Sequence, residues 1–209
     1  MAKLQVAIDL LTTADAIALA TKVAPYVDII ELGTPLIKSE GLAVITAMKK
    51  AFPDKLVFAD FKTADTGELE ADMAFGAGAD LVTILGVTDD STIIGAVKAA
   101  KKHGKGIVVD TIGVLDRVKR AQEVIALGAG FVELHAGLDE QAQPGYSIQV
   151  LIEEASRAGV PVSIAGGVKL SNIAAVKASG VKVAVAGAAI YGATDPAAAA
   201  KALREALDA

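Results

Sequence analysis

Short apolar runs recur along the chain at a nearly constant interval. Each run is rich in Val and Ile, is too short for a helix, and is flanked by Gly, Pro or Asp, which is typical of buried strands. Successive runs start roughly 21 to 30 residues apart. Eight strands are predicted, at Leu4–Asp9, Val27–Leu32, Leu56–Phe61, Asp80–Leu85, Gly106–Thr111, Gly130–His135, Val160–Ala165 and Val181–Gly187.

The stretches between these runs have helical periodicity. Ile17, Ala20 and Ala24 fall at positions i, i+3 and i+7, as expected of one face of a helix. Asp195-Pro196 predicts the start of the last helix, since proline is favoured at the first helical position. Strand–helix units whose strands are apolar on both faces predict an α/β protein, a single-domain (β/α)8 TIM barrel over residues 1–209. An open doubly wound sheet is the alternative, but no G-x-G-x-x-G motif follows the first run.

Composition narrows the class of protein. Of the 209 residues, 53% are hydrophobic and 22% charged, which excludes intrinsic disorder. The chain has no cysteine, which excludes disulfide scaffolds, zinc fingers and thiol nucleophiles. Its net charge is −5 and the sequence shows no basic patch, which argues against nucleic-acid binding. No apolar run reaches the roughly 18 residues that a membrane-spanning helix needs. We therefore expect a cytoplasmic protein that binds small molecules and neither nucleic acid nor a membrane.

Ionisable residues gather at the carboxyl ends of the predicted strands, and far fewer lie at the amino ends. Active sites of (β/α)8 barrels lie at the carboxyl ends. Stability alone does not explain this asymmetry, because charges that converge on a barrel axis repel one another or must be desolvated. The candidate catalytic and metal-binding residues are Asp9, Glu31, Asp60, Lys62, Asp65, Asp110 and His135.

Strand parity refines these candidates. Asp60 and Lys62 are two residues apart and are expected to face the same side, where a plain ion pair is the alternative to a catalytic role. Glu31 ends the neighbouring strand and could share a divalent cation with Asp60. A lone histidine is often a core residue, but His135 lies at the same carboxyl-terminal rim of the predicted barrel as the other ionisable residues, which favours a functional role. Glu133 has the parity of His135 and is expected to face the barrel interior.

Two turns of small residues follow the last two predicted strands. Gly166-Gly167 follows the seventh strand and Gly187-Ala188 the eighth. Such turns let backbone N–H groups approach a phosphate closely, and phosphate commonly binds at this place in barrels. The two turns together predict a phosphate-binding site.

The segment Asp60-Phe61-Lys62-Thr63-Ala64-Asp65 fits the D-x-K-x-x-D motif of the orotidine 5′-monophosphate decarboxylase suprafamily. With Asp9 and the run Glu31-Leu32-Gly33-Thr34-Pro35, the whole chain resembles the metal-dependent branch of that suprafamily. This branch contains 3-hexulose-6-phosphate synthases and 3-keto-L-gulonate 6-phosphate decarboxylases. Residues 132–141, with His135 followed by Ala136-Gly137-Leu138, are more similar to the synthases.

The resemblance implies a reversible aldol reaction of the ribulose monophosphate pathway. Formaldehyde and D-ribulose 5-phosphate would condense to D-arabino-hex-3-ulose 6-phosphate through a metal-stabilised enediolate. Mg²⁺, or Mn²⁺, would bind Glu31 and Asp60, Lys62 would offset developing negative charge, and His135 would transfer a proton. Asp65 and Asp110 would orient substrate hydroxyls.

The resemblance also implies a homodimer, because relatives place the second Asp of the motif, here Asp65, in the neighbouring subunit's site. Synthases commonly have glycine where Ala188 stands, but an alanine N–H can still donate unless the backbone needs a positive φ. Decarboxylase relatives have an arginine where Leu138 stands, which argues against that alternative. A non-catalytic sugar-phosphate-binding barrel would keep the glycine turns but would not need the ionisable rim.

Overall fold

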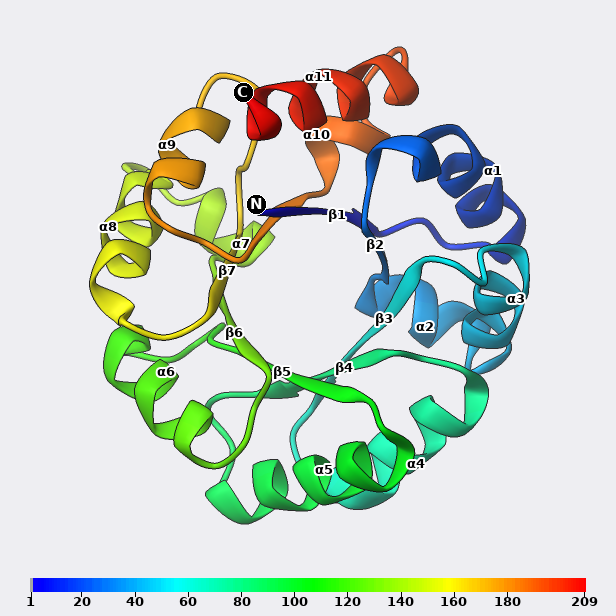
Figure 1. Ribbon diagram of the computed structural model, residues 1–209, viewed down its shortest axis with the longest axis vertical. Helices are drawn as coiled ribbons and strands as arrows, with labels where there is room; N and C mark the ends of the chain where they lie inside the picture. The colour runs from blue at the N-terminus through cyan, green and yellow to red at the C-terminus, as the bar shows by residue number, and fades with distance from the viewer. Residues whose placement is uncertain (1) are drawn as a thin grey trace.

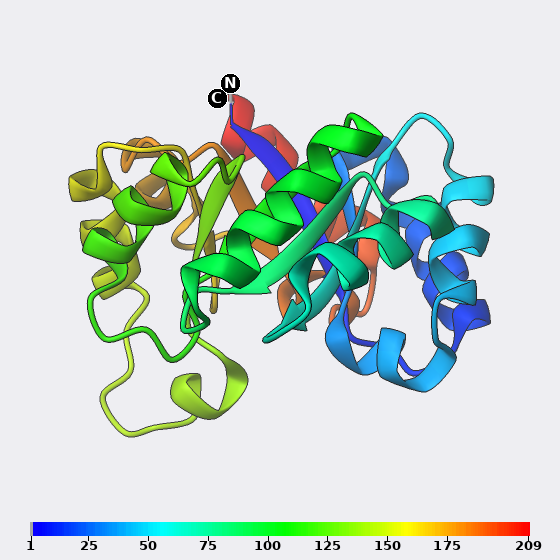
Figure 2. The same cartoon turned by 90° about the horizontal axis from the view of Figure 1, so that it is seen from below.

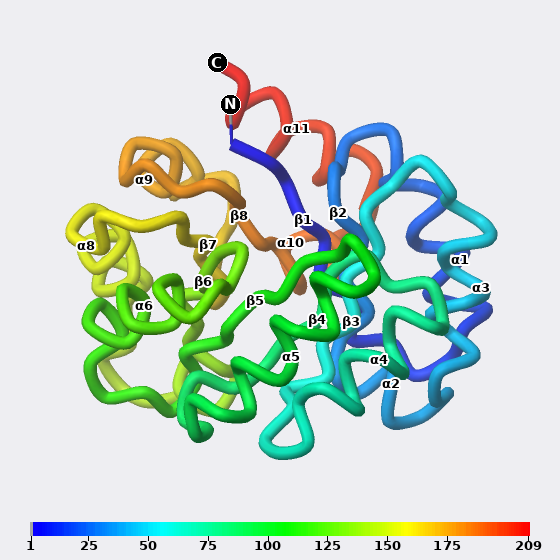
Figure 3. Tube along the Cα trace, turned by 60° about the horizontal axis from the view of Figure 1, so that its bottom comes forward, coloured from blue at the N-terminus to red at the C-terminus, as the bar shows by residue number. Residues whose placement is uncertain are grey.

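The computed structural model describes residues 2–209, in which eight parallel strands close into a barrel (Figure 1). Each strand pairs with the next along the chain, and β8 returns beside β1 (Figure 3). Each of the eight predicted runs overlaps one of these strands, so the predicted fold class is confirmed. The strands are β1 Lys3–Ile8, β2 Ile29–Leu32, β3 Leu56–Thr63, β4 Leu81–Leu85, β5 Gly106–Asp110, β6 Phe131–His135, β7 Val162–Ala165 and β8 Val183–Ala186.

The helices form the outer ring of the barrel (Figure 1). Asp195 caps the last helix by accepting a hydrogen bond from the Ala198 N–H at 3.1 Å, and Pro196 occupies its first turn, as predicted. No helix within residues 2–209 is long and apolar enough to cross a membrane. The helices are α1 Thr13–Val23, η1 Ala24–Tyr26, α2 Thr34–Glu40, α3 Ala43–Ala51, α4 Gly67–Ala77, α5 Asp90–His103, α6 Arg117–Ala126, α7 Leu138–Gln141, α8 Gln149–Ala158, α9 Ile173–Ala178, α10 Ala188–Tyr191 and α11 Pro196–Asp208.

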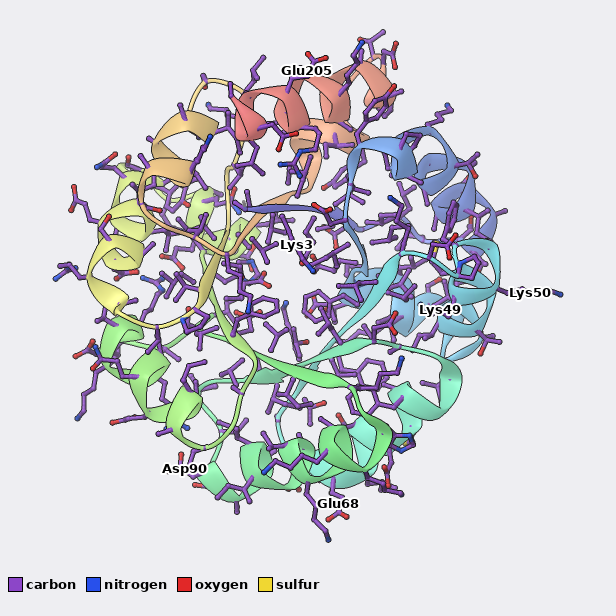
Figure 4. All side chains as sticks on the ribbon, in the orientation of Figure 1. Lys3, Lys49, Lys50, Glu68, Asp90 and Glu205 are labelled. Atoms are coloured by element: carbon purple, nitrogen blue, oxygen red, sulfur yellow. The ribbon has the colours of Figure 1, made fainter. Side chains whose placement is uncertain are left out.

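Alternating residues of each strand face the helices or the barrel axis. Leu4, Val6 and Ile8 of β1 are fully buried and belong to the apolar layer between strands and helices. A second apolar cluster, which includes Phe58 and Val108, lies inside the ring of strands. Side chains crowd the ring in Figure 4, where Lys3, near the start of β1, appears over it. The barrel interior is therefore packed and not a pore.

The axis-facing residues lie in layers of four that come from alternate strands, and the strand registers fix their order. The interior changes from apolar to charged toward the carboxyl ends of the strands. From the amino side upward, the layers are Ile29, Leu81, Phe131 and Val183; Gln5, Phe58, Val108 and Ser163; Glu31, Thr83, Glu133 and Val185; and Ala7, Asp60, Asp110 and Ala165.

The side view separates the two ends of the barrel (Figure 2). Both chain termini lie at one end, and α7 lies at the opposite end, where the strands finish and the charged layers open. The fold thus brings the ionisable strand ends to one rim, as the sequence predicts.

Candidate active site

Four of the predicted residues form one continuous chain of charged contacts across β3, β5 and β6. The Lys62 ammonium donates to Asp60 Oδ2 at 2.8 Å and to Asp110 Oδ2 at 2.9 Å. The same Asp110 oxygen lies 2.9 Å from His135 Nδ1. Lys62 thus bridges two carboxylates, and the second carboxylate orients the histidine ring.

The backbone at Lys62 departs from the expected extended strand. Lys62 has a φ of 50°, in the left-handed region, and the register between β3 and β4 shifts between Ala59 and Thr63. The Lys62 N–H donates to the Thr83 hydroxyl at 2.9 Å instead of to a ladder carbonyl. Non-glycine residues with positive φ are uncommon and often occur at functional sites, where the surroundings hold them. The side chains of Asp60 and Lys62 meet as expected, but through a bulge and not through simple parity.

Electrostatic interactions keep Lys62 and Asp110 charged. Burial alone would lower the pKa of Lys62, but the negative charges of Asp60 and Asp110 outweigh it and raise that pKa above its ordinary value. Burial would raise the pKa of the Asp110 carboxyl, but the hydrogen bond and charge of His135 and the charge of Lys62 lower it to about 2. At neutral pH Lys62 is therefore an ammonium and Asp110 a carboxylate.

Asp60 and Glu31 place two buried carboxyl groups on neighbouring strands. Asp60 accepts hydrogen bonds from the hydroxyls of Thr34 at 2.8 Å and Thr83 at 2.9 Å, in addition to those from Lys62. Glu31 accepts one from the Gln5 amide, between Nε2 and Oε2, at 2.7 Å. Burial and the nearby charge of Asp60 raise the pKa of Glu31 well above its ordinary value. Glu31 therefore needs either a proton or a cation beside it.

These two residues fit a hard divalent cation. No group of three or more His, Asp or Glu side chains within residues 2–209 is arranged to hold a metal. Magnesium, however, is commonly held by one or two carboxylates together with substrate and water oxygens. Glu31 and Asp60 supply such an all-oxygen pair, and the excess of negative charge at Glu31 is what a bound cation would relieve.

Asp9 lies close to the same pair, just beyond the end of β1. Burial and the charge of Asp60 raise the pKa of Asp9. A Cβ atom added at Gly33 would collide with the Asp9 carboxylate, so this position of the Glu31–Pro35 run requires glycine. Asp9, Glu31 and Asp60 thus converge at the mouth of the barrel.

The turn after β7 is built from two glycines in conformations that favour glycine. Gly166 and Gly167 have φ values of 120° and 89°, which disfavour any residue with a side chain. A Cβ on Gly166 would also lie 2.6 Å from the Ala136 carbonyl oxygen. The Tyr146 hydroxyl donates to the Gly166 carbonyl at 2.6 Å and fixes the turn from the segment after α7.

The turn after β8 tolerates its alanine. Gly187 precedes α10, whose first residue is Ala188. Ala188 does not have a positive φ, so its side chain introduces no backbone strain, and its N–H remains a possible donor. The departure from glycine therefore does not remove the predicted phosphate contact.

The structure does not bring Asp65 to the other candidates within one chain. Asp65 is exposed and accepts a hydrogen bond from the Thr66 N–H at 2.7 Å. It lines a surface hollow with Gly67, Ser91 and Gly95, between the start of α4 and α5.

Sequence reasoning gave no role to four residues that support the site, namely Gln5, Thr34, Thr83 and Tyr146. A signal existed for Gln5, since it is a polar residue within an apolar strand, and Thr34 lies inside the Glu31–Pro35 run. Thr83 and Tyr146 matter only through contacts with distant segments, which no local pattern reveals.

Comparison with known proteins agrees with this geometry. A family model described as "Orotidine 5'-phosphate decarboxylase / HUMPS family" matches residues 2–203. The chain belongs to this family. A 3-hexulose-6-phosphate synthase of Mycobacterium gastri is 69% identical over 205 residues, covering 98% of this chain and 99% of the relative.

Solved structures with two different named activities differ in their sequence identity to this chain. A crystal structure of a 3-hexulose-6-phosphate synthase is 70% identical, with a TM-score of 0.97, and covers 98% of this chain and 99% of its own. The 3-keto-L-gulonate-6-phosphate decarboxylase of Vibrio cholerae is 30% identical, with a TM-score of 0.86, over 99% and 97% of the two chains. The chain is thus much more similar to the synthases.

Proposed function

We propose that this chain catalyses the aldol condensation of formaldehyde with D-ribulose 5-phosphate to D-arabino-hex-3-ulose 6-phosphate. The observation that carries the proposal is the 69% identity to a 3-hexulose-6-phosphate synthase over nearly the whole chain. The bridged Asp60–Lys62–Asp110–His135 chain supplies the proton-transfer and charge-stabilising groups that this reaction needs.

His135 is our candidate for proton transfer at C1 of the pentose phosphate. The ionised Asp110 accepts from Nδ1–H, so Nε2 is the ring nitrogen left to take a proton, and 17% of the His135 side chain is exposed. Loss of the C1 proton allows C1 to bond to the carbon of formaldehyde, whose oxygen then takes a proton. Lys62 stabilises the negative charge that develops on the way.

The sequence suggests that Asp110 orients substrate hydroxyls. We propose instead that it acts through the residues that it contacts. Its side chain is 1% exposed, and both oxygens are occupied, Oδ1 by the Ile112 N–H and Oδ2 by Lys62 and His135. We therefore assign Asp110 a positioning role. Asp9, which is less buried, remains available for substrate hydroxyls.

Glu31 and Asp60 would hold Mg²⁺, with Mn²⁺ as the alternative ion, since their donors are oxygens. When bound there, the ion supplies positive charge that stabilises negative charge on substrate oxygens. The backbone N–H groups of Gly166, Gly167 and Ala188, with Gly187 allowing close approach, would bind the phosphate. Because a sugar phosphate does not cross membranes unaided, we place the reaction in the cytoplasm.

A homodimer would complete the site. Asp65 lies apart from its own chain's site, and α4 and α5, which line the same surface hollow, carry exposed apolar side chains. Leu69, Met73 and Ile94 are 61%, 45% and 50% exposed. Such apolar surface is typical of an interface, and association through α4 and α5 would bring Asp65 to the neighbouring subunit.

The segment after β6 argues against decarboxylation. Leu138 stands where the decarboxylase relatives have an arginine, and its side chain is 66% exposed. Arg117 does not replace that cation, because it is bound by Glu140 at 2.8 Å and Glu154 at 3.6 Å. Loss of such a contact to a developing anion commonly costs on the order of a hundredfold in rate.

The two reactions are compared directly on one preparation. We expect kcat/KM for ribulose 5-phosphate with formaldehyde to exceed that for 3-keto-L-gulonate 6-phosphate by on the order of a hundredfold or more. A larger value for the decarboxylation substrate would overturn the assignment. Binding of ribulose 5-phosphate without turnover of either substrate would identify a sugar-phosphate-binding protein instead.

A further inference from the structure

Three buried polar atoms inside the barrel have no hydrogen-bond partner within residues 2–209. They are Gln5 Oε1, Glu133 Oε2 and Ser163 Oγ. Their residues are 0%, 3% and 0% exposed, so bulk solvent does not satisfy them. Buried polar atoms are almost always paired with protein or with ordered water, and three orphans in one region therefore point to a shared partner.

The strand registers bring these residues together. Gln5 and Ser163 lie in one layer, on the two strands that flank β8. Glu133 is the register partner of Ser163 across β6 and β7, and both face the axis. Side chains of register partners on one face are close neighbours, so the three polar groups border one region just below the layer of Asp60 and Asp110.

The side chains above this region are small and apolar. Ala7, Ala165 and Val185 line the same side of the barrel toward the carboxyl ends. Ala7 faces the axis but is partly exposed, so solvent enters from the mouth as far as its layer.

The donors and acceptors of the three groups are complementary to one water. Gln5 uses Nε2 to donate to Glu31 Oε2, so its orphan Oε1 requires a donor. Ser163 can donate or accept. The Glu133 carboxyl oxygen can accept, so one water can donate to Gln5 and Glu133 while it accepts from Ser163.

We propose that Gln5, Glu133 and Ser163 hold a buried water molecule beneath the metal carboxylates, and that this water fixes the Gln5 amide that bonds Glu31. The three partners match the usual coordination of a buried water. Glu133 and Ser163 are then positioning residues, since they act on Glu31 through the water and Gln5. The water site stands on the structure alone, whereas its effect on Glu31 rests on the proposed metal site.

A high-resolution crystal structure of the unliganded enzyme tests the water directly. We expect density for a water roughly 2.7–3.2 Å from Gln5 Oε1, Ser163 Oγ and Glu133 Oε2. Direct bonds among these three atoms, without a water, would overturn the site.

Binding of Mn²⁺, followed by electron paramagnetic resonance, tests the effect on Glu31. Ser163→Val fills the water site and should weaken Mn²⁺ binding by about tenfold, a common result of changing groups behind metal ligands. Ser163→Ala removes one partner without adding volume and should act in the same direction. Val108→Ala, in the same layer, loosens packing without removing a polar atom and should change Mn²⁺ affinity by less than about twofold.

The outcomes separate the two proposals. Equal Mn²⁺ affinity in the Ser163 variants and in Val108→Ala would overturn the positioning role. A wild-type enzyme that binds no Mn²⁺ would overturn both the metal site and that role, while the crystallographic water alone would decide whether the buried water site exists.

Discussion

Lys62 is a buried cation fixed between Asp60 and Asp110, and this determines the type of aldol chemistry that it can perform. A lysine that forms a Schiff base must first become a neutral amine. The two carboxylates raise the pKa of Lys62 and hold it as an ammonium, which suits stabilisation of negative charge and not attack on a carbonyl.

We therefore expect sodium borohydride, added with ribulose 5-phosphate, to leave both the activity and the intact mass of the protein unchanged. An aldolase that forms a Schiff base, treated in parallel, should lose activity and gain the mass of the reduced adduct. A substrate adduct on Lys62, located by peptide mapping, would contradict the electrostatic role.

Glu31 is the residue whose charge most directly tests the proposed metal site. Glu31→Gln keeps the shape and an acceptor for the Gln5 amide, but it removes the negative charge that a divalent cation would neutralise. We expect the Mg²⁺ concentration for half-maximal activity to rise on the order of tenfold to a hundredfold. Chelation should abolish turnover of the wild-type enzyme.

The control for this prediction is Glu205→Gln on the outer face of α11, where Glu205 is exposed (Figure 4). It makes the same change of net charge and should leave the Mg²⁺ dependence unaltered. Full activity of the wild-type enzyme in excess EDTA would remove the metal from the mechanism.

At the scale of elements, the segment between α7 and α8 contacts the turn that follows β7. Tyr146, within this segment, bonds the Gly166 carbonyl and so holds the turn that we assign to phosphate. Loss of one such hydrogen bond typically costs about 1 kcal/mol, or roughly fivefold in an equilibrium constant.

Tyr146→Phe should therefore raise KM for ribulose 5-phosphate by roughly fivefold and leave kcat within about twofold. Tyr26→Phe makes the same change on η1, away from the phosphate turn, and should alter neither constant. A fall in kcat at constant KM would show that Tyr146 affects the chemical step and not phosphate binding.

The elements also show which features of the structure are determined by neighbouring residues in the sequence and could therefore be predicted from it. The strands were predictable because apolar runs bounded by Gly, Pro and Asp are local signals, and the carboxyl-terminal rim followed from counting strands. The bulge at Lys62 was not predictable, because it depends on a hydrogen bond to the Thr83 hydroxyl of another strand. The polar interior was predictable only in part: the parity of Glu133 was visible, but its unpartnered oxygen depends on residues far along the chain.

At the scale of the whole molecule, the position of Asp65 is the feature that one chain leaves unexplained. Lys62 and His135 point into their own barrel, whereas Asp65 lies on the outside, beside the apolar side chains of α4 and α5. If each site of a homodimer takes Lys62 from one chain and Asp65 from the other, the two residues can be supplied by different mutant chains.

Lys62→Ala and Asp65→Ala chains should then each be inactive alone and regain activity when they are dissociated and reassociated together. Random pairing makes half of the dimers hybrid, each with one intact site, so activity should approach about one quarter of the wild-type value. Lys62→Ala mixed with His135→Ala is the matched control and should stay inactive, because those residues belong to one chain's site. Equal recovery in both mixtures, or a fully active monomer in light scattering, would contradict a shared site.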